Sequence, residues 1–158
     1  MAGFLGEYNY SIDTKGRVSV PAKFRHTLSE ESEETFVVCE GPSGCLRAYP
    51  KDTWEDYEKE LFSRPQTQKN LKLMRRLRSS LSDTTIDSQG RISLNNRQLS
   101  IAGIGKKVVL VGNYGYIEIW DAERYEEYMD QVDDFDELFF ESEQGKEGKD
   151  KGDGFRLP

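Results

Sequence analysis

Two arginines share an unusual setting, because each follows a glycine and lies four residues after an aspartate. Arg17 is paired in this way with Asp13 in IDTKGRVS, and Arg91 with Asp87 in IDSQGRIS. An arginine that projects from a β-turn can place its planar guanidinium against O6 and N7 of guanine, or against a phosphate. A two-stranded ribbon is narrow enough to enter the major groove. Arg17 and Arg91 are therefore candidates for DNA contact.

The alternative is that each arginine pairs only with the aspartate across its turn and steadies that turn. An exposed ion pair of this kind contributes little, about 0–1 kcal/mol. The two roles are compatible, since an aspartate that orients the arginine also pre-organises it.

Three further cations lie close to the first turn in sequence. Lys15 is at the turn tip, where a phosphate contact is expected, and Gln89 replaces it in the second turn. Lys23 and Arg25 follow in a short helix and could add contacts to the DNA backbone. An ordinary solvated surface explains all three equally well.

The stretch 64–80 is strongly basic and contains no acidic residue, whereas the preceding stretch 52–60 is acidic. The basic stretch either binds DNA or pairs with the acidic helix or with a neighbouring subunit. We favour the packing role. Its basic residues are Arg64, Lys69, Lys72, Arg75, Arg76 and Arg78.

Five aromatic residues fall at related places in two parts of the chain: Trp54, Tyr57, Trp120, Tyr125 and Tyr128. Packing in the core or at a subunit interface is expected for them, rather than stacking on bases.

An enzyme is not predicted. The single histidine, His26, lies in a charged segment, and no serine, cysteine or lysine nucleophile is presented with a recognisable base. We expect no catalytic residue, metal site, cofactor or small-molecule substrate. Cys39 and Cys45 flank a predicted tight turn that would set Glu40 opposite Cys45, so we expect reduced, packed thiols rather than a disulfide.

The chain contains an internal duplication. Residues 9–20 align with 83–94 at an offset of 74, with five identities, and 37–49 align with 108–120 at an offset of 71. Each copy predicts a strand–turn–strand segment, a short helix, a second hairpin and a closing amphipathic helix. A single copy cannot cover the apolar faces of two small hairpins, so the two copies are expected to interleave.

The element pattern predicts a mainly β fold with short helices, of the α+β class. Pro21 opens the first short helix, helices are expected at 51–62 and 121–132 with Asp121 as N-cap, and another joins the copies at about 66–81. The predicted organisation is a first repeat at 1–62, a connecting helix at 63–82, a second repeat at 83–132 and an acidic, largely disordered tail at 133–158.

The net charge of −7 does not exclude a nucleic-acid partner, because the acid is unevenly distributed. Residues 133–158 carry nine acidic and four basic residues, a balance of −5, which leaves −2 for the rest of the chain. No apolar run approaches the length of a membrane span, and no signal peptide is recognisable. We expect a cytoplasmic protein without a membrane partner.

The segment GEYNYSIDTKGRVSVPAKFR resembles the opening signature of the MraZ family, and DSQGRISL with VVLVGNYGYIEIW resembles that family's second half. The resemblance covers the chain to about residue 130. It implies two AbrB-like swapped-hairpin modules related by pseudo-twofold symmetry, and a ring-shaped, octamer-like homo-oligomer associated with the nucleoid. It also implies DNA contact through Asp13 with Arg17 and Asp87 with Arg91.

One departure from the family pattern lies in the second copy. Asn95 stands where the first copy has Pro21, and Leu99 stands in place of Arg25. The second copy is therefore expected either to contact DNA less fully or to hold its short helix less firmly, unless Arg97 compensates.

The resemblance implies a sequence-specific regulator of the division and cell-wall gene cluster that includes its own gene. Such a protein would read short direct repeats in double-stranded DNA through its hairpin arginines. The alternative is a ring-forming scaffold or adaptor protein with incidental DNA affinity, which the acidic balance and the aromatic content favour.

Overall fold

The computed structural model describes residues 3–131 and 134–149. Its elements, in chain order, are β1 (Glu7–Ser11), β2 (Arg17–Ser19), α1 (Ala22–Thr27), η1 (Glu30–Ser32), β3 (Thr35–Glu40), η2 (Pro42–Gly44), β4 (Leu46–Pro50), α2 (Lys51–Phe62), α3 (Gln68–Ser80), β5 (Ser82–Thr85), β6 (Arg91–Ser93), α4 (Asn96–Ala102), β7 (Lys107–Asn113), β8 (Tyr116–Asp121), α5 (Ala122–Asp130) and α6 (Phe135–Lys149).

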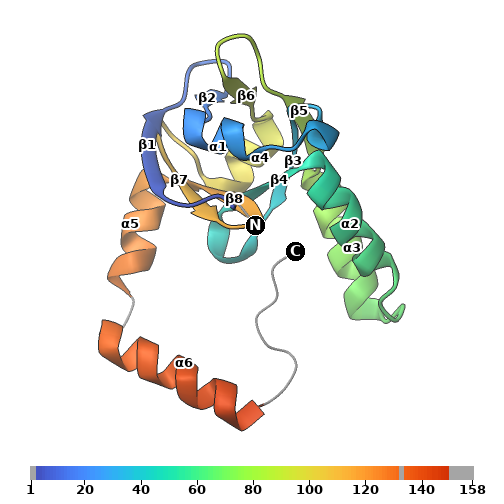
Figure 1. The fold of residues 1–158 in the computed structure, drawn as a ribbon, viewed down its shortest axis with the longest axis vertical. Coiled ribbons are helices and arrows are strands. Elements are labelled where there is room, and N and C mark those ends of the chain that lie inside the picture. Colours follow the sequence, from blue (N-terminus) through green and yellow to red (C-terminus); the bar gives the residue numbers. More distant parts are fainter. Residues whose placement is uncertain (1–2, 132–133, 150–158) are drawn as a thin grey trace.

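The strands of the two repeats interleave, as the duplication predicted. One antiparallel sheet has the order β1-β7-β8-β4-β3-β5, and a second consists of β2 and β6 (Figure 1). The first strand of each repeat pairs with the second hairpin of the other, β1 with β7 and β5 with β3. This order reads the same from both ends when the repeats are exchanged. The predicted duplicated fold with swapped strands is confirmed.

The strand–turn–strand segments differ from simple hairpins. The turn of the first closes as expected, with the Asp13 N–H donating to the Arg17 carbonyl oxygen at 3.1 Å. Beyond the turn, β2 leaves β1 and pairs with β6, so that Val18 lies opposite Ile92. Both side chains are buried in the core. Each of these three-residue strands has one apolar face. The pairing of β2 with β6 places both apolar faces on the same side, against the core.

Apolar side chains fill the space between the sheets, α1 and α4. The members of this cluster include Phe4, Val18, Val20, Phe24, Phe36, Val38, Leu46, Ala48, Ile92, Leu94, Val108, Leu110, Ile117 and Ile119. Trp54 and Trp120 belong to two smaller buried clusters under α2 and α5, together with Tyr57 and Tyr125. The packing role expected for these four aromatic residues is confirmed. Tyr128 is 43% exposed, but its ring also packs against Trp120, with ring centroids 5.1 Å apart.

Both thiols are free and buried, as expected. The predicted register was wrong by one residue, because the Gly41 N–H donates to the Cys45 carbonyl oxygen and Glu40 lies opposite Leu46. Burial raises the pKa of each thiol to about 12.

The helices follow the predictions closely except at the C-terminal end. α2 spans the predicted 51–62, and α5 begins after Asp121, whose side chain accepts the Arg124 N–H at 3.1 Å. Within the tail that the sequence predicts to be largely disordered, residues 135–149 form α6. Phe135, Leu138 and Phe139 have helical spacing there. The Gly-rich composition of the tail as a whole does not reveal this local pattern. Residues 133 and 150–158 lie outside the described residues. Within the described ranges, no helix combines the length and apolar character needed to cross a bilayer.

The short helix of the second repeat, α4, is firmly held. The expectation that the replacement of proline by Asn95 would loosen this helix is therefore wrong. The Asn95 side chain accepts the Gln98 N–H at 2.8 Å, and the Gln98 side chain accepts the Asn95 N–H at 3.0 Å. Gln98 is fully buried, and its Nε2 donates to the carbonyl oxygens of Ser80 at 2.8 Å and Val38 at 3.1 Å. This one side chain ties α4 to β3 and to the end of α3.

We predict that Gln98→Leu lowers the free energy of unfolding by about 1–3 kcal/mol, because it leaves buried carbonyl and N–H groups without their partner. Urea denaturation followed by circular dichroism measures this loss. Gln89→Leu at the exposed second turn is the matched control and should stay within about 0.5 kcal/mol. Equal stabilities for the two variants would contradict the role given to Gln98.

Candidate nucleic-acid interface

The first turn is built around the Asp13 carboxylate. Its Oδ1 accepts the backbone N–H groups of Lys15 at 2.9 Å and Arg17 at 2.8 Å, and its Oδ2 accepts Nε–H of Arg17 at 2.7 Å. Gly16 has φ +79°, and a Cβ there would lie 2.5 Å from the carbonyl oxygen of Leu94. Only glycine satisfies both conditions. The turn and the orientation of Arg17 are therefore fixed together.

The second turn repeats this arrangement. Oδ1 of Asp87 accepts the backbone N–H groups of Gln89 at 2.9 Å and Arg91 at 3.0 Å, and Oδ2 accepts Nε–H of Arg91 at 3.0 Å. Gly90 has φ +78°. The duplication thus preserves every hydrogen bond of the turn, although the residue at its tip changes from Lys15 to Gln89.

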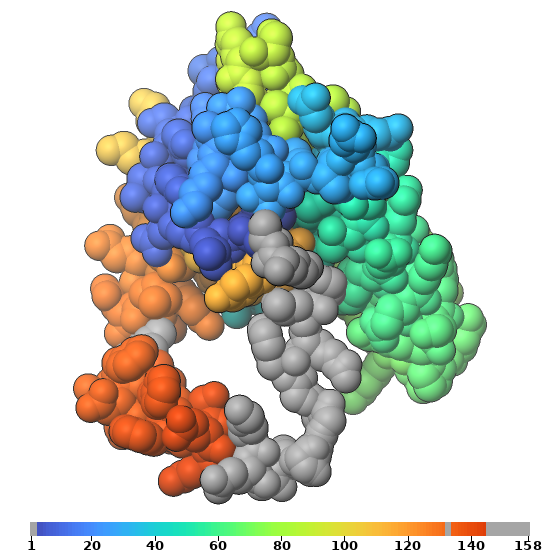
Figure 2. Space-filling model, viewed as in Figure 1, coloured from blue at the N-terminus to red at the C-terminus, as the bar shows by residue number. Residues whose placement is uncertain are grey.

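The two turns form one surface. Because β2 pairs with β6, Arg17 lies opposite Ser93 and Ser19 opposite Arg91. Nη1 of Arg91 also lies 3.8 Å from Oδ2 of Asp13, so the charges of the two turns meet. Figure 1 shows both turns projecting at the same end of the molecule, and in Figure 2 the yellow-green second turn stands beside the blue first turn.

The side chain of each arginine is partly exposed. The side chain of Arg17 is 32% exposed and that of Arg91 is 25% exposed. Nε of each is held by its own aspartate, whereas the terminal Nη atoms make no hydrogen bond to another of the described residues. The two guanidinium groups are thus oriented while their terminal donors stay available to a ligand.

The aspartates carry the charge that orients the arginines. The hydrogen bond from the backbone N–H of Arg17 is the largest influence on the pKa of Asp13. Together with the Arg17 side chain it outweighs the opposing effect of desolvation and holds this pKa below the ordinary value of 3.8. The backbone N–H of Arg91 lowers the pKa of Asp87 in the same way. Both carboxylates are therefore ionised at neutral pH.

The three other predicted DNA contacts, Lys15, Lys23 and Arg25, have different surroundings. Lys15 and Lys23 are exposed, the first at the turn tip and the second on α1. Arg25 is also exposed; its Nε donates to the Val20 carbonyl oxygen at 3.1 Å, and the side chain lies beside Gly90 of the second turn. Its Cζ would lie 3.2 Å from a Cβ at Gly90.

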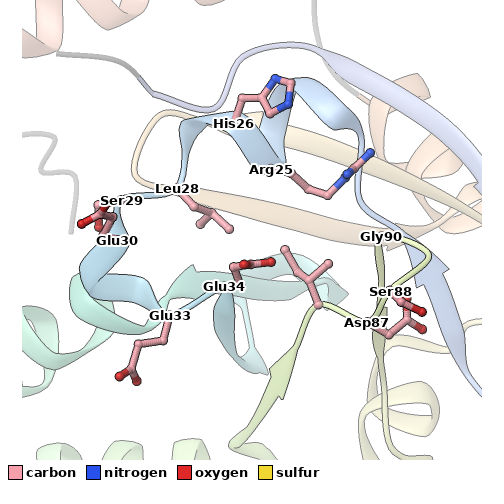
Figure 3. Close-up of a pocket in the computed structure, with 11 residues that line it drawn as sticks. Arg25, His26, Leu28, Ser29, Glu30, Glu33, Glu34, Asp87, Ser88 and Gly90 are labelled. Atoms are coloured by element: carbon pink, nitrogen blue, oxygen red, sulfur yellow. The ribbon is translucent and has the colours of Figure 1, made fainter.

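A hollow of about 730 Å³ lies between α1 and the second turn (Figure 3). Arg25 and His26 line one wall, and the carboxylate-bearing residues are Glu30, Glu33, Glu34 and Asp87. Among the residues that the structure describes, no group of histidine, cysteine and carboxylate side chains could hold a metal ion. The carboxylates outnumber the cations in this hollow, which makes it unfavourable for a phosphate group.

The basic stretch packs only partly as expected. Arg64 pairs with Glu60 of the acidic helix, with Nη2 2.8 Å from Oε1. Arg76 pairs instead with Glu40 at the end of β3, through two hydrogen bonds of 2.9 Å.

Sequence analysis missed two residues of the turn surface, Ser19 and Ser93. They lie opposite the arginines in the β2–β6 ribbon. Their identity in both copies was the available signal, but only the cross-repeat pairing shows that they share a face with Arg17 and Arg91.

Comparison with known proteins gives a consistent result. The family described as "MraZ protein, putative antitoxin-like" matches residues 4–77 and 81–143. A protein of Lachnoclostridium phytofermentans named transcriptional regulator MraZ is 39% identical over 135 residues, which cover 85% of this chain and 92% of the relative. The proteins of the same name from Clostridium tetani and Halothermothrix orenii are 36% and 37% identical, covering 85% and 83% of this chain and 93% and 90% of those relatives.

We predict that the carboxyl carbons of Asp13 and Asp87 titrate below pH 3.8 in the folded protein, as followed by ¹³C NMR. A lowered pKa contributes stability that is present above the unfolded-state value and is lost as the pH falls through the folded-state value. The turns should therefore persist at about pH 4 and open only in stronger acid. A peptide of residues 9–20 is the control and should titrate near the ordinary value, about 3.9. Equal midpoints in protein and peptide would contradict the described turn geometry.

Proposed function

The chain belongs to the MraZ family, and from this membership we propose that it is a transcriptional regulator that binds double-stranded DNA at specific sequences. The observation that carries the proposal is the pair of Asp–Arg turns on one protruding surface. The curated relatives are named transcriptional regulators, which supports the regulatory role.

The turn surface enters the major groove, and the free Nη groups of Arg17 and Arg91 donate to O6 and N7 of guanine. Because Nε of each arginine is already held by an aspartate, less side-chain freedom is lost on binding. Arg17 and Arg91 are diagonal neighbours in the β2–β6 ribbon, and the Cα atoms of such neighbours are about 7–8 Å apart. This spacing corresponds to roughly two steps of about 3.4 Å along a DNA strand, so both arginines read within one short sequence element.

Contacts to phosphate position the protein and are unequal in the two turns. Lys15 is exposed at the tip of the first turn, where Gln89 occupies the second. Lys23 and Arg25 on α1 are further candidates, although Arg25 already lies beside Gly90 of the second turn. The first repeat therefore supplies more of the electrostatic binding.

A ring-shaped homo-oligomer, octamer-like in the family resemblance, presents many identical turn surfaces. Several weak contacts then combine through a high effective concentration. Such an assembly matches a target of short direct repeats. We place these targets in the division and cell-wall gene cluster that includes the protein's own gene, and the protein itself in the cytoplasm at the nucleoid.

The second candidate function is a ring-forming scaffold or adaptor protein with incidental DNA affinity. The net charge of −7 favours it. A gel-shift assay on the DNA upstream of the protein's own gene separates the two functions, since no shift at low salt would support the scaffold.

We predict that the Arg17→Ala, Arg91→Ala double variant weakens specific binding by about 1–3 kcal/mol per arginine. Fluorescence anisotropy on the footprinted upstream DNA measures the loss. Arg64→Ala is the matched control, because Arg64 also pairs with a carboxylate and is similarly exposed at 36%, but lies on the α2–α3 connection. Unchanged affinity of the double variant would refute the assignment of these arginines.

We predict opposite salt effects for the two tip residues. Lys15→Gln removes one phosphate neighbour per bound turn and should flatten the slope of log affinity against log salt by about 0.9 for each bound turn. Gln89→Lys should steepen the slope by a similar amount. Identical slopes for both variants and the unchanged protein would show that the turn tips do not meet phosphates.

A further inference from the structure

An apolar pocket lies between α3 and the β3–β4 hairpin, on a part of the molecule that the proposed DNA contact does not use. Its volume is about 260 Å³, and its apolar walls include Cys39, Tyr49, Tyr57, Leu73 and Leu77. Leu73 is 39% exposed, although it lines the pocket. An apolar side chain that enters the pocket would therefore cover apolar surface that is now exposed to water.

The same pocket is lined by two arginines and one carboxylate, Glu40, so its lining carries a net positive charge. Nε of Arg47 is buried and has no hydrogen-bond partner among the described residues, although Nη1 donates to the Tyr49 hydroxyl at 3.1 Å. The Cζ of Arg47 also lies 4.2 Å from the centroid of the Tyr116 ring, so the positive charge of Arg47 is held in the wall of the pocket. Arg76 lines the pocket and is 73% exposed, although its guanidinium is paired with Glu40. The adjoining exposed face of α3 carries Lys72 and Arg75, for which no ion pair is found within the described chain.

Helix α6 has the complementary character. Phe135, Leu138 and Phe139 lie on one face at helical spacing, with exposed fractions of 71%, 38% and 50%. Asp136 and Glu137 flank this apolar stripe, and no basic residue occurs between Asp134 and Gln144. The apolar stripe of α6 therefore matches the apolar walls of the pocket beside α3, and its acidic border matches the cations of α3.

We propose that α6 of one copy of this chain docks in the pocket beside α3 of a second copy. In Figure 1, α5 and α6 descend on one side of the strands, whereas α2 and α3 lie on the other. Such a contact joins two different surfaces, and contacts of this type generate rings when the rotation between copies closes. The inference rests on the proposed function for its role in a ring, but the contact itself can be tested without DNA.

The test uses two full-length variants that damage opposite sides of the contact. Phe139→Glu places a charge in the stripe of α6, and Leu73→Glu places one at the pocket. Both positions are exposed, and circular dichroism checks that the fold is kept. In sedimentation velocity, each variant alone should lose the assembly that the unchanged protein forms and sediment as a single chain.

Mixing the two variants in equal amounts should restore a species of two chains. The intact α6 of Leu73→Glu can dock in the intact pocket of Phe139→Glu, whereas no further copy can be added. Leu5→Glu is the control, since Leu5 is also an exposed apolar residue, at 45%, and this variant should assemble normally.

Two results would overturn the inference. One is undiminished assembly of either variant, and the other is a mixture that stays single-chain. Neither result bears on the reading of DNA by the turns, because the Arg17→Ala, Arg91→Ala double variant tests that function with the α6 contact intact. Conversely, a failure of that double variant to lose DNA affinity would leave the α6 contact standing.

Discussion

The structure depends on one interaction made twice, in which an aspartate closes a turn and holds an arginine at the same time. One carboxylate oxygen accepts two backbone N–H groups and the other accepts the arginine Nε. The left-handed glycine beside the arginine makes this possible, since a Cβ at Gly16 would strike the Leu94 carbonyl. Folding of the turn and orientation of the arginine therefore cannot be separated, because the carboxylate that closes the turn also holds the arginine side chain.

The interleaving of the repeats adds a second constraint, because each repeat supports the turn of the other. Arg25 lies against Gly90 of the second turn, and Leu99, at the corresponding place in α4, lies near Gly16 of the first. The two supports differ in chemistry, one a cation and the other an apolar side chain. The change from Arg25 to Leu99 thus keeps the mechanical role while removing a positive charge, which agrees with the unequal tips Lys15 and Gln89.

Much of this could be predicted from the sequence, and what could not has a physical reason. The repeat, the limits of α2 and the cap at Asp121 follow from local patterns of spacing and capping. The pairing of β2 with β6 does not, because an alternating pattern shows which face of a strand is buried but not which strand lies beside it. For the same reason Ser19 and Ser93 were missed. The buried role of Gln98 depends on three segments that meet only in the folded chain.

The arrangement of the elements separates the proposed DNA contact from the proposed contact between copies. The turns project at one end of the molecule, whereas α2, α3, α5 and α6 extend toward the other (Figure 1). Binding through many weak sites requires that assembly leave every site free, since a turn covered by a neighbouring subunit would add nothing to the effective concentration. A contact between α6 and the pocket beside α3 meets that requirement. It also places the acidic residues of α6 against the cations of α3 rather than near the phosphates, so an acidic chain can present a surface that attracts DNA.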